Sequence, residues 1–311
     1  MRRPVEQYGG TGRWLERRER RQPFAEPGSA GRERKAARDV RRAPAPAKIN
    51  LALVVGPARE DGKHEVATVL QRVDLGDRVS IGPATTLTVT GFAGDTLVRD
   101  ALGALAAAAG VEPRWQATIA KRIPVAAGLG GGSSNAATAL RLANETLDNP
   151  LPPSDLQSLA ATVGADVPFF LADGPQLGRG DGSELEAVDL PQDYWVVVAL
   201  PLGATKESTA AIYRRFDNRA GADGWKTRNA TLQTALAAVR RPRDLAALPP
   251  NDLASSPLAA ELLRLGAFRA DVSGAGPAVY GLFHHRRHAR AARQALRRAA
   301  RTWLTIPVWY G

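Results

Sequence analysis

The sequence predicts an α+β fold in two domains. The first observation is the mixed order of the predicted elements, because strands and helices neither alternate strictly nor separate into blocks. The second is the composition, with 44% hydrophobic and 23% charged residues, which excludes a chain that is disordered throughout. The third is the length of 311 residues, which is enough for a large core and for one or two domains.

The first predicted elements are mostly strands. The apolar run 47–55 is ended by Gly56 and Pro57, and further strands are expected at 65–73, 78–81 and 86–90. An alanine- and leucine-rich helix is expected at 96–109, ended by Gly110, and a strand at 115–119. Helices are then expected at 134–147 and 154–163, the second with Ser154 as its N-cap and Gly164 just past its end.

The second half is predicted to mix both kinds of element. An apolar strand at 194–200 is followed by helices at 207–216, 231–239 and 257–265, the last with Pro257 as its first residue. Strands at 270–273 and 279–283 precede an arginine-rich helix at 286–303 and a last strand at 304–309. Three glycines in 178–183 make this segment the candidate linker. We therefore expect an N-terminal domain at 43–186 and a C-terminal domain at 187–311.

The positive charge is concentrated in two segments. The chain carries a formal net charge of +11, and residues 1–42 and residues 284–301 each contribute +7, which leaves −3 for the remainder. Residues 1–42 have scattered glycines and no apolar periodicity, so they are predicted to form a disordered basic arm. Such an arm either has no specific role or binds RNA or another polyanion loosely.

The composition also excludes several classes of site. The chain has no cysteine, which excludes disulfides, cysteine-ligated metals and a thiol nucleophile. Three of its four histidines lie together in the basic segment 284–301, so no metal centre is expected. Its N-terminus is rich in arginine without an apolar signal core, and no apolar run is long enough to span a bilayer. A cytoplasmic location is therefore expected.

The glycine- and serine-rich segment 123–137 carries the strongest functional signal. Glycines let backbone N–H groups approach a ligand, and the start of the following helix adds unpaired donors and a positive dipole end. Together they predict a phosphate cradle, with Ser133 and Ser134 either capping the helix or binding a phosphate oxygen or its metal ion. The segment lacks the lysine of a P-loop and the third glycine of a dinucleotide fingerprint. The alternative is a flexible loop before an ordinary helix.

Three further features have both a structural and a functional interpretation. Asp166 follows a helix end and precedes an apolar run, so it is either a turn residue or a general base at the rim of a buried wall. Lys48 lies in an apolar strand, where it either points outward or is a buried cation paired with a carboxylate. The glycine-rich segment 272–280 would by itself be interpreted as a turn between strands.

Taken together, three segments resemble the GHMP small-molecule kinases. They are Ala47–Leu51, Pro124–Ser134 and Ser273–Ala278, in this order. Four shorter segments, at 62–65, 164–169, 208–213 and 251–253, narrow the resemblance to the 4-diphosphocytidyl-2-C-methyl-D-erythritol kinases of non-mevalonate isoprenoid synthesis. The similarity runs from about residue 43 to about residue 304. It implies an N-terminal half of the ribosomal S5 domain 2-like type and a ferredoxin-like C-terminal half, with ATP and substrate meeting between them.

The resemblance also implies roles for single residues. Lys48 and Asp166 match the catalytic pair, and His64 matches a residue that contacts the cytosine edge. Asn50 lies on the substrate side, and Tyr213 matches an aromatic residue that stacks on the cytosine, with Thr209 in the same motif. The residues that match the ATP-phosphate loop are Pro124, Val125, Ala126, Ala127, Gly128, Leu129, Gly130, Gly131, Gly132, Ser133 and Ser134.

The implied reaction is phosphorylation of the 2-hydroxyl of the cytidine-carrying alcohol by ATP. Asp166 would accept the hydroxyl proton, and Lys48 would stabilise charge on the phosphoryl group. Mg²⁺ is expected with ATP and needs no protein cage of its own. The expected partners are ATP and one small molecule, in a monomer or homodimer, without a membrane and with nucleic acid only through the basic arm. The alternatives are a homoserine- or mevalonate-type alcohol, a nucleic-acid-binding protein and an inactive relative.

One position departs from the family pattern. Lys63 stands between Gly62 and His64, where the family usually has a tyrosine that forms the second half of a stacking pair around the base. A lysine cannot stack in the same way, although it could lie over the ring or bind a phosphate of the diphosphate. The departure bears on the identity of the substrate more than on the class of reaction.

Overall fold

The first sheet is built on two long antiparallel strands. β1 (Arg41–Ala58) and β2 (His64–Pro83) pair from Arg41 opposite Ile81 to Ala58 opposite His64. This computed structural model describes residues 40–308, apart from 93, 95, 205 and 206. The predicted arm therefore lies outside the described residues up to residue 39, whereas Arg41 and Arg42, which were assigned to it, belong to β1.

Four shorter strands complete the first sheet along the other edge of β2. They are β3 (Thr88–Thr90), β4 (Trp115–Ala120), β5 (Gln176–Arg179) and β6 (Glu184–Ala187), in the order β3-β4-β2-β5-β6 with β1 outside this path. The predicted strands at 65–73 and 78–81 are one strand, because the chain stays extended through Gly76. A Cβ at Gly76 would lie 3.0 Å from the carbonyl oxygen of Ala45, so glycine lets β1 pass closely.

The candidate linker is instead part of this sheet. Residues 178–183 lie at the tip of the β5–β6 hairpin, in which Gly178 pairs with Leu185. Its glycines serve the tight turn, since Gly180 and Gly182 have positive φ angles of 65° and 102°. The predicted boundary at 186/187 falls just before the end of β6 at Ala187 and stays a prediction.

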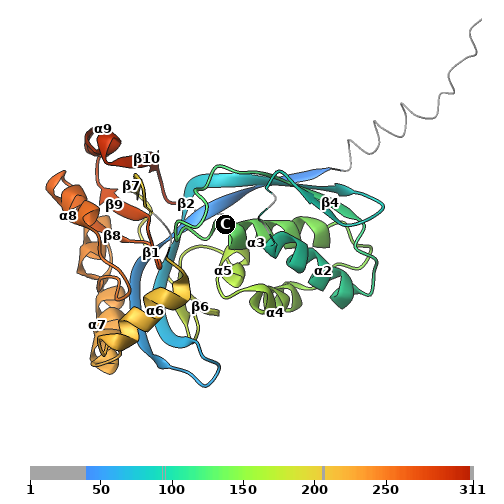
Figure 1. The fold of residues 1–311 in the computed structure, drawn as a ribbon, viewed down its shortest axis with the longest axis horizontal. Coiled ribbons are helices and arrows are strands. Elements are labelled where there is room, and N and C mark those ends of the chain that lie inside the picture. The colour runs from blue at the N-terminus through green and yellow to red at the C-terminus, as the bar shows by residue number, and fades with distance from the viewer. Residues whose placement is uncertain (1–39, 93, 95, 205–206, 309–311) are drawn as a thin grey trace, which may run out of the picture. The chain divides into compact units, whose positions relative to one another are not determined.

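Helices cover one face of the first sheet (Figure 1). They are α2 (Leu97–Ala109), α3 (Gly131–Asn144), α4 (Pro153–Val163) and the short α5 (Val167–Leu171). Apolar residues of α2 and α3 pack with Val79 and Ile81 of β2 and with β4 in one core cluster. Gly110 ends α2 in the left-handed conformation, as predicted. Ser154 is not the N-cap of α4, because the helix begins one residue earlier, at Pro153.

The second sheet has four antiparallel strands. Its order is β10-β7-β9-β8, with β7 (Trp195–Pro201), β8 (Arg269–Val272), β9 (Val279–Phe283) and β10 (Ala300–Thr305). The last predicted helix, 286–303, is too long, since α9 (Arg286–Ala295) gives way to a short 3-10 turn, η2 (Leu296–Arg298), and then to β10. Pairing of Trp303 with Val198 of β7 overrides the local helix propensity of arginine and alanine.

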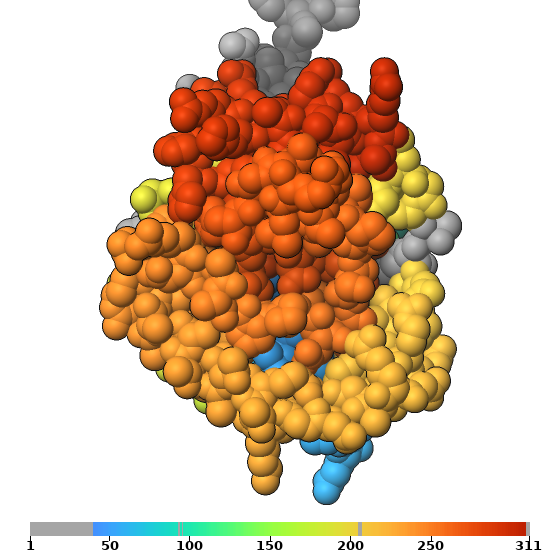
Figure 2. All heavy atoms as spheres, turned by 90° about the vertical axis from the view of Figure 1, so that its left-hand side faces the viewer, coloured from blue at the N-terminus to red at the C-terminus, as the bar shows by residue number. Residues whose placement is uncertain are grey.

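The remaining helices lie around the second sheet and the C-terminal end of β1. They are α6 (Thr209–Asn218), α7 (Trp225–Ala238), η1 (Pro242–Ala247) and α8 (Pro257–Arg264). Ser256 caps α8 through the N–H of Leu258, as Pro257 at its start predicts. In Figure 2 the elements of the second half cover this side of the molecule, and the tip of the blue β1–β2 hairpin protrudes below the orange-yellow helices.

One core cluster joins the two sheets. It contains Ile49 and Leu51 of β1 together with Val198, Tyr280 and Leu282 of the second sheet. Every residue of β1 from Ala45 to Gly56 is buried, which explains its nearly continuous apolar sequence. β1 therefore carries its side chains into both halves of the fold at once.

Candidate active site

The glycine loop leads directly into α3. Gly130 is the N-cap residue, with a φ of +67°, and no side chain caps the helix. Ser133 and Ser134 lie inside the first turn, so the predicted capping role is wrong for both. A Cβ at Gly130 would come within 2.9 Å of Lys48 Cγ and of Phe170 Cζ. Among the described residues, no side chain therefore caps the first N–H groups of the helix, and the backbone conformation and close contacts at position 130 favour glycine.

The loop is held in place from both halves of the chain. The N–H of Lys48 donates to the carbonyl of Leu129 at 3.0 Å, and the N–H of Ala278 donates to that of Ala127 at 2.9 Å. Ser273 Oγ donates to the carbonyl of Gly128 at 2.9 Å. The segment 273–278, which alone would be a turn, thus packs against the phosphate-loop candidate.

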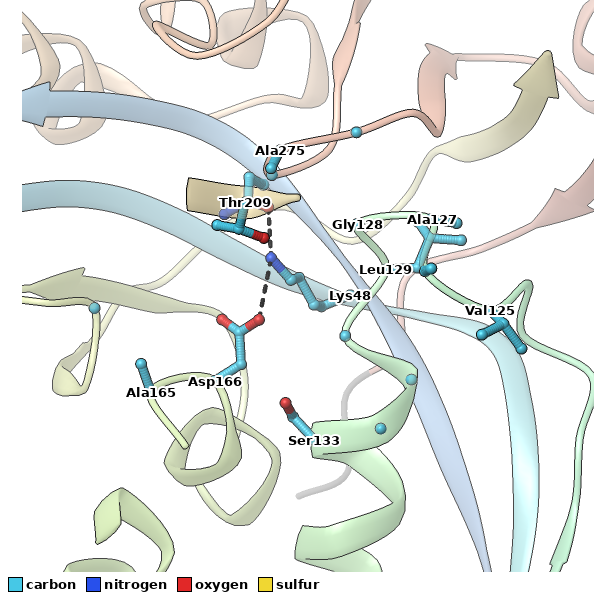
Figure 3. A pocket seen from close by; sticks show the side chains of 18 of the residues that line it. Lys48, Val125, Ala127, Gly128, Leu129, Ser133, Ala165, Asp166, Thr209 and Ala275 are labelled. Atoms are coloured by element: carbon cyan, nitrogen blue, oxygen red, sulfur yellow. Dashed lines mark hydrogen bonds and ion pairs between the residues drawn. The ribbon is translucent and has the colours of Figure 1, made fainter. Parts of the chain in front are cut away.

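Lys48 and Asp166 face each other beside this loop. Figure 3 shows the two side chains pointing together, and Lys48 Nζ lies 3.6 Å from Asp166 Oδ2. The Lys48 side chain is only 6% exposed, which rules out the outward-pointing interpretation, whereas that of Asp166 is 42% exposed. Asp166 immediately precedes α5, and its side chain makes no cap hydrogen bond there. Its carboxylate is therefore open to a ligand on one side and to an ammonium on the other.

A chain of buried hydrogen bonds fixes Lys48. Its Nζ donates to Asn50 Oδ1 at 2.7 Å, and Asn50 Nδ2 donates to Thr68 Oγ1 at 2.8 Å. Thr68 in turn donates to the carbonyl of Ala52 at 2.9 Å. Because all three side chains come from β1 and β2, the central hairpin sets the position of the ammonium. Asn50 thus supports Lys48, as well as lining the cavity.

These groups line one cavity of about 600 Å³. Of the residues predicted to bind ATP, every one from Pro124 to Ser133 lines it, and so do Lys48, Asn50, Asp166, Thr209 and Tyr213. Two predicted residues do not. Ser134 is fully buried in α3, and its Oγ has no hydrogen-bond partner among the described residues. His64 is buried as well and turns toward α6.

His64 packs against Tyr213, which lines the cavity, but does not line the cavity itself. Its ring centroid lies 4.6 Å from that of Tyr213, and its Nε2 lies 2.7 Å from Asp217 Oδ1. Burial, and then the negative charge of Asp166, raise the pKa of Tyr213 to about 12. The phenol is thus neutral at ordinary pH, and it lies close enough to Asp166 for the negative charge of that carboxylate to affect its pKa.

Sequence reasoning missed two charged pairs at the cavity. Lys121 lines it near α3 and donates to the buried carboxylate of Asp77 at 2.5 Å, and Asp77 also accepts from the N–H groups of Arg122 and Ile123. Asp181, which pairs with Lys63, lines it at the β5–β6 tip. The only sequence signal for Lys121 is its place between a strand and the glycine loop. Asp181 carries no sequence signal of a functional role, because it stands in a glycine-rich segment typical of a linker.

Known proteins match both halves of the chain. The family profile described as "GHMP kinases N terminal domain" matches residues 96–174, and "GHMP kinases C terminal" matches residues 252–302. A protein of Geobacter sulfurreducens named 4-diphosphocytidyl-2-C-methyl-D-erythritol kinase is 36% identical over 85% of this chain and 96% of its own length. The chain belongs to the GHMP kinases. A relative of the same name in Anaeromyxobacter is 39% identical over 83% of this chain and 85% of its own.

Solved structures agree with this membership. A 4-(cytidine 5'-diphospho)-2C-methyl-D-erythritol kinase has a TM-score of 0.70 and 31% identity over 87% of this GHMP kinase and 100% of its own chain. A mevalonate kinase reaches a TM-score of 0.69 with 14% identity over 87% and 99% of the two chains, which shows the shared fold alone. The predicted α+β fold of the GHMP type is confirmed.

Two features are absent from the described residues. No group of three or more His, Cys, Asp or Glu side chains in residues 40–308, with the gaps given above, is placed to hold a metal ion. Within the same ranges, no helix has both the length and the apolar character needed to cross a membrane.

Proposed function

We propose that this GHMP kinase transfers the γ-phosphoryl group of ATP to the 2-hydroxyl of 4-diphosphocytidyl-2-C-methyl-D-erythritol. The observation that carries the proposal is the Lys48–Asp166 pair, 3.6 Å apart, beside the open N-terminus of α3 in a single cavity. The relatives that bear this name, at 35–39% identity over most of the chain, supply the choice of alcohol.

Asp166 is the candidate general base. The hydroxyl oxygen of the alcohol attacks the γ-phosphorus, its proton passes to Asp166, and the bond from the γ-phosphorus to the bridging oxygen of ADP breaks. The carboxylate is suited to this step because one side is exposed to the cavity while Lys48 holds the other. Lys48, fixed by Asn50, offers its positive charge to the phosphoryl group as charge develops there.

The glycine loop is the candidate phosphate site. Gly131, Gly132 and Ser133 of the first turn of α3 line the cavity, and the N–H groups and positive dipole end of a helix start favour an anion. Lys121 adds a cation beside this turn, since a Cβ at Gly131 would lie only 2.9 Å from its Nζ. The phosphates of ATP thus have backbone donors on one side and an ammonium on the other.

The residues at the loop also fit Mg²⁺. Mg²⁺ in kinases is held by one or two carboxylates and by the substrate phosphates, and it keeps several waters. Ser133 lines the cavity in the first turn of α3. Its hydroxyl would hold the ion together with the phosphates and water, which leaves Asp166 to accept the proton, and the bound ion would neutralise phosphate charge. We also propose a cytoplasmic location and a monomer or homodimer.

The decisive experiment measures ADP release with a panel of alcohols. The purified full chain is given ATP, Mg²⁺ and, in separate reactions, the cytidine-carrying methylerythritol, mevalonate and homoserine. We expect turnover with the cytidine compound to exceed that with the other two by at least about 100-fold in kcat/KM, with phosphorus NMR placing the new phosphate on the 2-hydroxyl. Preference for mevalonate or homoserine would refute the assignment of the alcohol.

A further inference from the structure

A charged pair at the tips of two hairpins stands where the family pattern has an aromatic residue. Lys63 Nζ lies 2.5 Å from Asp181 Oδ2, which joins the tip of the β1–β2 hairpin to the tip of the β5–β6 hairpin. Asp181 and Gly182 line the cavity together with Val66, Thr68 and Tyr213, whereas Lys63 does not line it. The charged residue that lines this wall is therefore Asp181 and not Lys63.

The hydrogen bonds of Asp181 leave it one free acceptor position. Its Oδ1 accepts from Ser183 N–H at 3.1 Å and from Ser183 Oγ at 2.6 Å, and its Oδ2 accepts from Lys63. An ionised carboxylate can accept about four hydrogen bonds, so one position remains. Burial alone raises the pKa of Asp181, but the hydrogen bonds from Lys63 and Ser183 outweigh it and lower the pKa to about 2. The side chain is 15% exposed and ionised at neutral pH.

From the residues that the structure describes, this wall offers a ligand a hydrogen-bond acceptor and no free cation. Lys63 is neutralised by Asp181 and lies outside the cavity lining, so it is not available to bind the diphosphate of a substrate. A carboxylate facing the ligand disfavours an anion and favours a hydroxyl or an amine. The nucleoside part of the proposed substrate carries both donors, as ribose hydroxyls and as the 4-amino group of cytosine.

We propose that Asp181 is a specificity-determining residue that accepts a hydrogen bond from a donor on the nucleoside part of the substrate, and that Lys63 is its positioning residue. The proposal rests on the proposed function. The nucleoside lies between Tyr213 and the two hairpin tips, and its contact with Asp181 forms alike in the ground state and the transition state. Removing that contact therefore changes KM and leaves kcat alone.

The test compares Asp181→Asn, Lys63→Met and the double variant with the wild-type chain. Substrates are the cytidine compound, its uridine analogue and its 2′-deoxycytidine analogue. Asp181→Asn should raise KM for the cytidine compound about 10- to 100-fold, with kcat within about threefold. It should also reduce the preference for the cytidine compound over one of the two analogues. A smaller preference over the uridine analogue would identify the 4-amino group as the donor. A smaller preference over the 2′-deoxy analogue would identify the ribose hydroxyl as the donor.

Lys63→Met leaves an unpaired carboxylate beside a substrate with a diphosphate. Its KM should therefore rise, and the rise should shrink as salt screens the repulsion. In the double variant the effect of Lys63→Met should largely disappear, because the charge it exposes is gone. Arg264→Met is the control, since Arg264 pairs with Glu261 on the surface of α8 and does not line the cavity. It should change none of these values.

The outcomes separate this proposal from the proposed function. If the wild-type chain does not phosphorylate the cytidine compound, the function fails. If it does, and Asp181→Asn leaves KM within twofold or raises it equally for all three substrates, then Asp181 recognises no donor and the inference is overturned. A fall in kcat at constant KM would overturn it as well, because that result belongs to a residue engaged in the transition state.

Discussion

The carboxylate of Asp166 has a role that a single atom exchange can test. Asp166→Asn keeps the size of the side chain but removes the proton acceptor, so kcat should fall about 100- to 10,000-fold. The thermal midpoint should change little, because the side chain is 42% exposed and lies at the cavity rather than in the core. Rapid-quench single turnovers and calorimetry measure the two quantities.

Asp155→Asn is the control for that substitution, since Asp155 lies in the first turn of α4 and does not line the cavity. It should keep full activity. If the Asp166 variant turns over within threefold of the wild type, the hydroxyl proton goes elsewhere and Asp166 is not the base.

Tyr213 offers a second test at the residue scale. Its ring lies against His64 and lines the cavity, so it is the candidate stacking surface for the base. Stacking of a base on an aromatic side chain contributes about 1–3 kcal/mol in nucleic-acid complexes. Tyr213→Ala should therefore raise KM for the cytidine substrate about 5- to 100-fold, whereas Tyr213→Phe should stay near the wild type. Equal losses in both variants would indicate that the hydroxyl matters instead of the ring.

A site residue could be predicted from the sequence when the residues that reveal its role lie close to it in the chain. Lys48 and the glycine loop stand in local motifs whose residue types are unusual for a strand and for a helix start. The Lys63–Asp181 pair joins two residues 118 positions apart. Lys63 was unusual as a departure from the family pattern, but nothing in the sequence indicated Asp181 as its partner. His64 was expected at the cytosine edge, and that role stays a prediction, since its ring contacts Tyr213 and Asp217.

At the scale of elements, the loop before α3 depends on its glycines. Gly130→Val would force a β-branched residue to a φ of +67° and bring its Cβ within 2.9 Å of Lys48 Cγ and of Phe170 Cζ. Calorimetry should show at least a tenfold loss of ATP affinity, because the start of α3 must move. An unchanged affinity would remove the loop from the nucleotide site.

Gly103→Ala in α2 is the matched glycine variant. It places a Cβ where no other atom lies within 4 Å, in the middle of a helix. It should raise the free energy of unfolding by about 0.5–1 kcal/mol and leave ATP binding unchanged. Chemical denaturation measures the first quantity.

Local patterns predicted most elements but not how they pair. The position and type of β7, β9 and α8 follow from apolar runs and from the Ser256–Pro257 start. The end of α9 could not be predicted locally, since arginine and alanine favour a helix as far as Trp303, and only the edge of β7 draws the chain into β10. Similarly, the β5–β6 tip has linker chemistry, and its pairing with Thr68 of β2 is a long-range contact.

For the molecule as a whole, the described fold begins at β1, and the cavity residues lie between Lys48 and Gly276. Deleting residues 1–38 should therefore leave kcat/KM and the thermal midpoint nearly unchanged. Deleting residues 1–46 should lower the midpoint by several degrees, because it removes buried Ala43 and Ala45 and their pairing with β2. A loss of stability in the shorter deletion would show that the arm contributes to the fold.

The core that joins the two sheets should make unfolding a single event. Ile49 and Leu51 pack with Val198, Tyr280 and Leu282, so neither half can lose its packing alone. Differential scanning calorimetry should show one transition whose calorimetric and van't Hoff enthalpies agree. Two resolved transitions would mean that the halves are independent domains.

The early position of the long β1–β2 hairpin in the sequence has a consequence for folding during synthesis on the ribosome. The hairpin is synthesised before its partners, and its apolar side chains in the shared core are covered in part by strands of the second sheet, the last of which ends at Thr305. At about 5–20 residues per second, the nascent hairpin waits roughly 10–50 seconds for those strands to emerge. During that interval it presents an apolar face and unpaired strand edges to other chains, which are the features that chaperones bind and that aggregation exploits. Synthesis of the C-terminal strands is therefore the event that ends this exposure.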